Sequence, residues 1–91
     1  MAYEIRSSRR VVRELADLRS IEPAFQRLLE RVFERLIADP RPDGRGIKKL
    51  KNRPEYAVRI TRRYRLVFQV QDQVVVITGV GHRREVYRRR S

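Results

Sequence analysis

The chain has 91 residues, of which 23 are lysine or arginine and 11 are acidic, so its formal net charge is +12. This length allows a single domain, residues 1–91, and the charge indicates a polyanionic or acidic partner. The absence of cysteine excludes disulfide scaffolds and thiolate zinc sites, and one histidine cannot build the usual cluster of metal ligands, so we expect no cofactor.

The chain begins with a predicted strand and helix. Tyr3 and Ile5 alternate with polar residues, which is typical of a strand over about residues 2–6. Ser7 or Ser8 then caps a helix, because a serine oxygen can accept a hydrogen bond from a free amide of the first turn. The apolar residues of this helix recur every three or four positions: Val11, Val12, Leu15 and Leu18.

A second helix is predicted after Glu22-Pro23, since proline is tolerated in a first turn. The turn-forming run of residues 39–44 ends it, so the two helices are expected to form an antiparallel hairpin. Its apolar residues keep the helical period: Phe25, Leu28, Leu29, Val32, Phe33, Leu36 and Ile37.

The segment from Gly44 to Pro54 is strongly basic and is expected to be a loop anchored by Ile47 and Leu50. Phosphate contact by its cations is one interpretation, and an ordinary solvated loop is the other. The cations are Arg45, Lys48, Lys49, Lys51 and Arg53.

Three strands are predicted next, over roughly residues 56–61, 64–71 and 74–80, joined by short turns. In the first two, alternation places apolar side chains on one face and cations on the other. The third is apolar on both sides, which is typical of a strand inside a sheet. The predicted fold class is therefore α+β, with an N-terminal strand, an antiparallel helical hairpin and a three-stranded antiparallel meander, the helices packing on one sheet face.

A basic site is expected on the sheet face that the helices leave open. Arg59 and Arg65 project from that face, near the strand ends that lead to His82, Arg83 and Tyr87. Guanidinium offers a planar fork of donors to phosphate, and tyrosine offers a stacking face and a hydroxyl. The alternative is that Arg59 and Arg65 only keep an open sheet soluble.

The chain ends in a further basic run, within which Arg84 and Arg88 are candidate contacts for nucleic acid. The alternative is a solvated basic tail after the last strand.

Two segments are the most specific in the sequence, Tyr64-Arg65-Leu66-Val67-Phe68 and the ending Val80-Gly81-His82-Arg83-Arg84-Glu85-Val86-Tyr87. Together with the order of the predicted elements, they make nearly the whole chain resemble the RelE/ParE superfamily of bacterial toxins. The resemblance implies a type II toxin-antitoxin pair. In the RelE branch the toxin cleaves mRNA in the ribosomal A site, whereas in the ParE branch it inhibits DNA gyrase.

The RelE branch, which we favour, implies attack of the ribose 2′-hydroxyl on the adjacent phosphate without a metal, leaving a 2′,3′-cyclic phosphate and a 5′-hydroxyl. Arg59 and Arg65 would stabilise charge on the phosphate, and His82 is the candidate proton carrier. The resemblance implies that Arg83 contacts the phosphate or protonates the leaving oxygen, and that Tyr87 orients the sugar or stacks on a base. A histidine that only ends a strand is the alternative for His82.

One departure from the RelE pattern concerns proton transfer. RelE proteins carry lysines at two alternating positions of the first meander strand, where this chain has Ala57 and Arg59. Lys49, Lys51 or His82 can take over the lost function, or the protein cleaves slowly, or it acts like ParE. A basic nucleic-acid-binding module without catalysis is a third alternative, although the sequence carries no known motif of that kind.

The expected partners are a cognate acidic antitoxin and the ribosome with its mRNA, or DNA gyrase in the alternative branch. A +12 chain suits an acidic amphipathic helix. The resemblance implies that operator DNA is bound only through the antitoxin complex. No apolar run reaches the roughly 18 residues of a membrane span and no secretory signal begins the chain, so a cytoplasmic protein without membrane contact is expected.

Overall fold

The computed structural model describes residues 2–43 and 46–88, and it confirms the predicted α+β class. Two elements were not predicted, β2 in the basic loop and α3 in the basic tail, and none of the described helices has the length and apolar character that a membrane span needs. The elements are β1 (Glu4–Ser7), α1 (Arg9–Ile21), α2 (Phe25–Ala38), β2 (Ile47–Lys49), β3 (Tyr56–Arg59), β4 (Tyr64–Gln71), β5 (Val74–His82) and α3 (Arg83–Arg88).

The five strands form one mixed sheet in the order β1-β5-β4-β3-β2. β1 runs parallel to β5, and the other neighbours are antiparallel. β5 therefore lies inside the sheet, as its two apolar sides predict. The register between β4 and β5 shifts after Val67, so that Thr78 becomes an extra residue of β5, and such a bulge increases the local twist.

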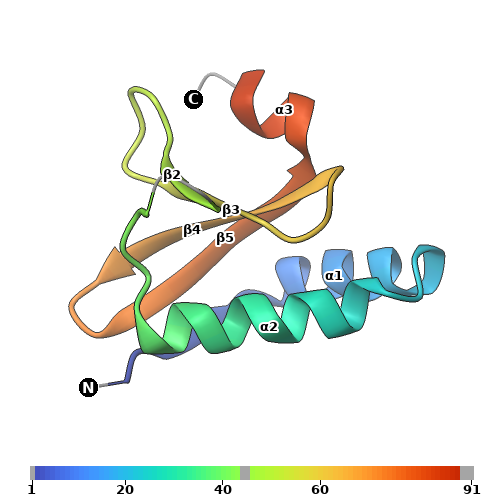
Figure 1. Ribbon diagram of the computed structural model, residues 1–91, viewed down its shortest axis with the longest axis horizontal. Coiled ribbons are helices and arrows are strands. Elements are labelled where there is room, and N and C mark those ends of the chain that lie inside the picture. The colour runs from blue at the N-terminus through green and yellow to red at the C-terminus, as the bar shows by residue number, and fades with distance from the viewer. Residues whose placement is uncertain (1, 44–45, 89–91) are drawn as a thin grey trace.

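Helices α1 and α2 cover one face of the sheet, which is its lower face in the view of Figure 1. We call this the hairpin face. Most of the buried apolar side chains meet here, and each contributes roughly 1.5 to 3 kcal/mol when it leaves water. Among them are Val11, Leu15, Phe25, Leu29 and Leu36 from the helices and Val58, Leu66, Phe68, Val75 and Ile77 from the sheet.

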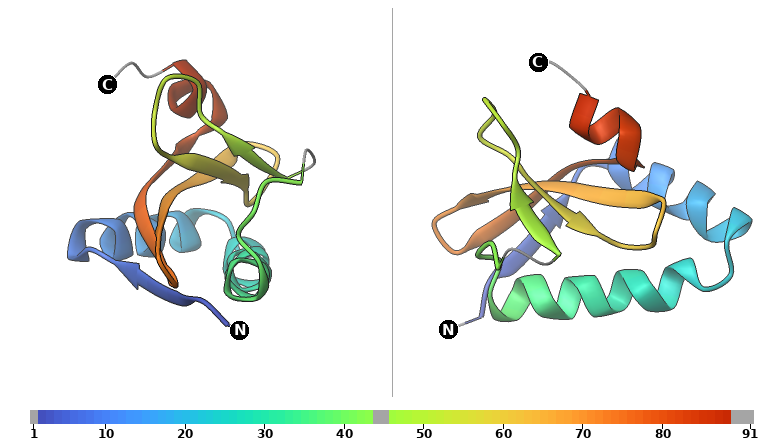
Figure 2. Two further views of the ribbon diagram at one scale, coloured as in Figure 1. Left: turned by 90° about the vertical axis from the view of Figure 1, so that its left-hand side faces the viewer. Right: turned by 45° about the horizontal axis from the view of Figure 1, so that its top comes forward.

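The opposite face, which we call the α3 face, is partly covered by α3 and by the loop between β2 and β3 (Figures 1 and 2). Val86 of α3 is buried there against Leu50, Ala57 and Val67. The expectation that this face stays open is therefore wrong. One apolar residue in a run of charged ones is enough to dock a helix as short as α3, because small Ala57 leaves room for it.

The N-cap of α1 decides between the two serines that the sequence offered. Ser8 Oγ accepts a hydrogen bond from the amide of Val11 at 3.2 Å. Ser8→Ala is expected to lower the free energy of unfolding by about 1 kcal/mol, measured by urea denaturation, because the amide loses its partner. Ser7→Ala is the matched control and should have almost no effect. Equal losses in the two variants would contradict the assignment.

The turn after α2 holds a local ion pair, in which Asp39 accepts hydrogen bonds from the amide (3.0 Å) and Nη2 (2.8 Å) of Arg41. The Arg41 hydrogen bonds lower the pKa of Asp39 from 3.8 to about 2. The pair therefore stabilises the fold above pH 4 or so, and this contribution is lost as the pH falls through about 2. In an NMR titration, Arg41→Ala should raise the pKa of Asp39 towards its ordinary value. An unchanged pKa would exclude Arg41 as the cause.

Candidate nucleic-acid interface

Two neighbouring rows of residues cross the sheet on the α3 face. Lys48 on β2 stands opposite Ala57 on β3. In the next row, Arg59 stands opposite Arg65, which in turn stands opposite Gly81. Residues directly opposite one another have Cβ atoms about 5 Å apart and share a face. The predicted common face of Arg59 and Arg65 is thus confirmed, and Lys48 joins them as a diagonal neighbour of Arg59.

Lys48 lies where it can replace the lysine that RelE proteins carry and that this chain lacks at Ala57. Ala57 is fully buried, at 0% exposed, beneath Val86 and Leu50, so a longer side chain has no room while α3 is docked. Lys48 lies directly across the strand pair and carries an ammonium on the same face. The sequence suggested Lys49, Lys51 or His82 as the replacement and not Lys48. A strand of only three residues has no pattern that shows on which face its side chains lie.

The two arginines differ in how firmly they are held. Arg59 is exposed, and its side chain makes no hydrogen bond or ion pair within the described part of the chain. Arg65 is half-buried, and its Nη1 lies 2.9 Å from the carbonyl oxygen of Thr61 and 3.1 Å from that of Tyr64. The Arg65 guanidinium is thus fixed in place before any ligand arrives, which reduces the entropy lost on binding.

A groove runs between α3 and the loop that follows β2, on the same face. Its volume of about 280 Å³ is close to the lower end of small-ligand sites. Tyr87 of α3 is 48% exposed here, so both its ring and its hydroxyl can reach a ligand. We call this the lysine groove, and it is lined by Lys48, Lys49, Leu50, Lys51, Arg53, Val86 and Tyr87.

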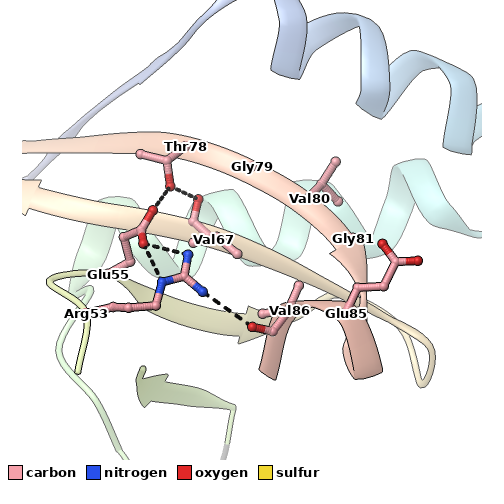
Figure 3. Close-up of a pocket in the computed structure, with 9 residues that line it drawn as sticks. All are labelled: Arg53, Glu55, Val67, Thr78, Gly79, Val80, Gly81, Glu85 and Val86. Atoms are coloured by element: carbon pink, nitrogen blue, oxygen red, sulfur yellow. Dashed lines mark hydrogen bonds and ion pairs between the residues drawn. The ribbon is translucent and has the colours of Figure 1, made fainter. Parts of the chain in front are cut away.

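One wall of the groove is held by a nearly buried ion pair between Arg53 and Glu55 (Figure 3). Arg53 Nε donates to Glu55 Oε1 at 2.8 Å, and Arg53 Nη1 reaches the carbonyl oxygen of Val86 in α3 at 3.4 Å. The other carboxylate oxygen of Glu55 accepts from the Thr78 hydroxyl at 2.9 Å. With its side chain only 9% exposed, Arg53 does not fit the predicted role of a nucleic-acid contact.

The cavity beneath this pair is not a ligand site. It has a volume of only about 30 Å³, which is the share of one water molecule in the liquid. No group of three or more residues that could hold a metal ion occurs in the described part of the chain.

His82 does not join Arg59 and Arg65. It stands opposite Tyr64, whose ring packs on the hairpin-face core, and the two rings meet edge to face at 6.0 Å. Consecutive strand residues point to opposite faces, so Gly81 faces α3 and His82 does not. His82 Nδ1 also accepts a hydrogen bond from the amide of Arg84 at 3.2 Å, which occupies the nitrogen that a general base would need.

The remaining predicted residues are distributed as follows. Arg83 and Arg84 are exposed at the start of α3, and Lys51 is exposed in the lysine groove. Lys49 Nζ donates to the carbonyl oxygens of Leu50 and Arg53 and lies 5.9 Å from the centre of the Tyr56 ring, so it mainly holds its own loop. Arg45 lies outside the described residues, as does the side chain of Arg88.

Comparison with known families finds one match over most of the chain. The family model described as "ParE toxin of type II toxin-antitoxin system, parDE" matches residues 5–87. No curated protein sequence matches significantly.

Solved structures give similar folds. RelE of Pyrococcus horikoshii in its complex with RelB is 25% identical, with a TM-score of 0.73 over 91% of this chain and 97% of that one. A double arginine-to-alanine variant of E. coli RelE in the free state is 28% identical, with a TM-score of 0.70 over 90% and 84%. The Staphylococcus aureus YoeB dimer, at 19% identity and a TM-score of 0.75 over 90% and 98%, is similar in fold.

Proposed function

Because this chain belongs to the ParE toxin family, and is thus the toxin of a type II toxin-antitoxin system, we propose that it acts by cutting mRNA on the ribosome. The observation that supports this most is the group of Lys48, Arg59 and Arg65 on the α3 face, beside exposed Tyr87. Cations that stabilise a phosphate, a residue able to exchange a proton and an aromatic ring together suit cleavage of RNA.

In the proposed reaction, the ribose 2′-oxygen forms a bond to the adjacent phosphorus while the bond from phosphorus to the 5′-oxygen breaks. Arg59 and Arg65 stabilise the negative charge on the non-bridging oxygens, and donors of this kind are each worth about 10² to 10³ in rate. Lys48 takes the proton of the 2′-hydroxyl, because lysine exchanges a proton more readily than arginine does. Arg83 contacts the phosphate or protonates the leaving 5′-oxygen, and Tyr87 orients the sugar or stacks on a base.

A cognate acidic antitoxin is the proposed partner that holds the toxin inactive. The P. horikoshii RelE structure is a complex with RelB, and a second S. aureus structure is a complex of YoeB with its antitoxin YefM. Exposed Val12 and Ile21 on α1 and Ile37 on α2, together with the +12 charge, would suit an acidic amphipathic segment. Operator DNA would be bound only through that complex.

Inhibition of DNA gyrase is the second candidate, because the matching family model is that of ParE toxins and because Ala57 is buried where RelE proteins carry a lysine. Two assays of the purified protein separate the candidates. We expect it to block translation of a reporter mRNA in a reconstituted system and to leave gyrase supercoiling intact. Normal translation with blocked supercoiling would instead select the gyrase function.

A further inference from the structure

A second cationic site lies away from the lysine groove, where the turn between β3 and β4 meets the start of α3. Four arginines and one histidine surround an open cavity of about 360 Å³ there, and no carboxylate lines it. We call this group the arginine cluster, and its members are Arg62, Arg63, His82, Arg83 and Arg84. The lysine groove shares none of these residues.

The four guanidiniums of the cluster are unpaired. All four arginines are exposed, and none of their side chains makes a hydrogen bond or ion pair within residues 2–43 and 46–88. The described carboxylates that do form ion pairs lie elsewhere, on Glu4, Asp39, Asp43 and Glu55. Like charges around one cavity repel each other, so this arrangement gains most from an anionic ligand.

The backbone that carries the cluster is fixed by hydrogen bonds. Thr61 Oγ1 accepts from the amides of Arg63 and Tyr64, both at 3.2 Å. The amide of Arg83 donates to the carbonyl oxygen of Arg63 at 2.7 Å, which ties the turn to the start of α3. Arg65 closes the turn from the side through its bonds to the carbonyl oxygens of Thr61 and Tyr64. The backbone positions of the cations are thus set before a ligand binds, and only their side chains have to be ordered on binding.

We propose that Arg62, Arg63 and Arg84 of the arginine cluster bind a phosphodiester group of a nucleic-acid strand, at a second position beside the scissile phosphate that Arg83 contacts. Guanidinium pairs with phosphate oxygens through two parallel hydrogen bonds, and all four arginines can do so. The inference rests on the proposed RNA substrate in naming the strand, although the phosphate chemistry holds for DNA as well. An acidic protein segment suits the cluster less well, because such segments are anchored by buried apolar contacts and this cavity has no apolar lining residue.

The test uses the salt dependence of binding, because each phosphate contact adds about 0.7 to the slope of log affinity against log salt for single strands. The probe is a labelled RNA of about 12 nucleotides with 2′-O-methyl riboses, which cannot undergo 2′-hydroxyl attack. A DNA strand of the same sequence forms the second arm. Arg62→Gln combined with Arg63→Gln is expected to lower the slope by about 1.4, since two contacts are lost.

The matched control is Arg27→Gln combined with Arg31→Gln, which removes the same charge from exposed positions of α2. It should leave the slope unchanged, whereas an equal fall in both double variants would overturn the proposal. Arg62→Lys combined with Arg63→Lys should restore most of the slope, and failure to do so would assign the loss to distortion of the turn and would also overturn it. A change with the RNA probe alone assigns the site to RNA, and a change with both assigns it to either strand.

Failure of this inference and failure of the proposed function are distinguishable. If the Arg62/Arg63 double variants keep the salt slope of the wild type and the wild type still cuts mRNA, only the proposal for the arginine cluster is contradicted. If the slope falls in the double variants but the wild type leaves mRNA intact, only the proposed cleavage is contradicted.

Discussion

Glu55→Gln is expected to lower the free energy of unfolding by about 3 kcal/mol, because the substitution leaves the guanidinium of Arg53 nearly buried without its counter-charge. The side chains of Arg53 and Glu55 are 9% and 16% exposed, so water can replace little of what is lost. The same change weakens the attachment of α3 to the sheet, since Arg53 also donates to the carbonyl oxygen of Val86. Urea denaturation of the purified protein measures the effect.

Two controls separate the buried pair from charge loss in general. Glu4→Gln removes one partner of an exposed pair, with side chains 57% and 67% exposed, and should change the unfolding free energy by less than about 1 kcal/mol. Arg53→Met combined with Glu55→Leu should be less destabilised than the sum of the single variants, because no unpaired charge stays buried. If Glu55→Gln and Glu4→Gln unfold at the same urea concentration as the wild type, the ion pair is not a support of α3.

Arg59→Ala is expected to reduce the rate of RNA cleavage by a factor of about 10² to 10³ while leaving the fold intact. Arg59 is exposed and its side chain makes no bond within the described part of the chain, so its loss removes charge from the phosphate site and little else. Single-turnover cleavage of ribosome-bound mRNA, together with thermal denaturation, measures the two effects separately.

The matched control for Arg59 is Arg27→Ala, which removes an exposed arginine from α2 on the opposite side of the sheet. It should cleave at the rate of the wild type. If Arg59→Ala cleaves at the same rate as the wild type, Arg59 has no part in the reaction.

The fold was predictable where the pattern of apolar residues was long. The helical period of α2 continues over several turns, and the alternation of β4 continues over eight residues. Patterns of this length do not fit another type of secondary structure. β2 has three residues and α3 buries one apolar residue, Val86, so neither has a period that a sequence can reveal.

The site was predictable only as far as strand alternation reaches. It places Arg59 and Arg65 correctly on one face, because both lie in predicted strands. The position of His82 depends on the bulge at Thr78 and on β5 extending further than predicted, and neither leaves a signal in the sequence. Arg53 was assigned to nucleic acid because it lies in the basic segment, and the sequence does not show that it forms a nearly buried pair with Glu55.

The chemical nature of the mRNA ends left by the wild-type protein on translating ribosomes tests the central claim most directly. Attack by the ribose 2′-hydroxyl next to Lys48, Arg59 and Arg65 predicts that each upstream fragment ends in a 2′,3′-cyclic phosphate and each downstream fragment begins with a 5′-hydroxyl. Full-length mRNA, or fragments that end in a 3′-hydroxyl, would contradict it.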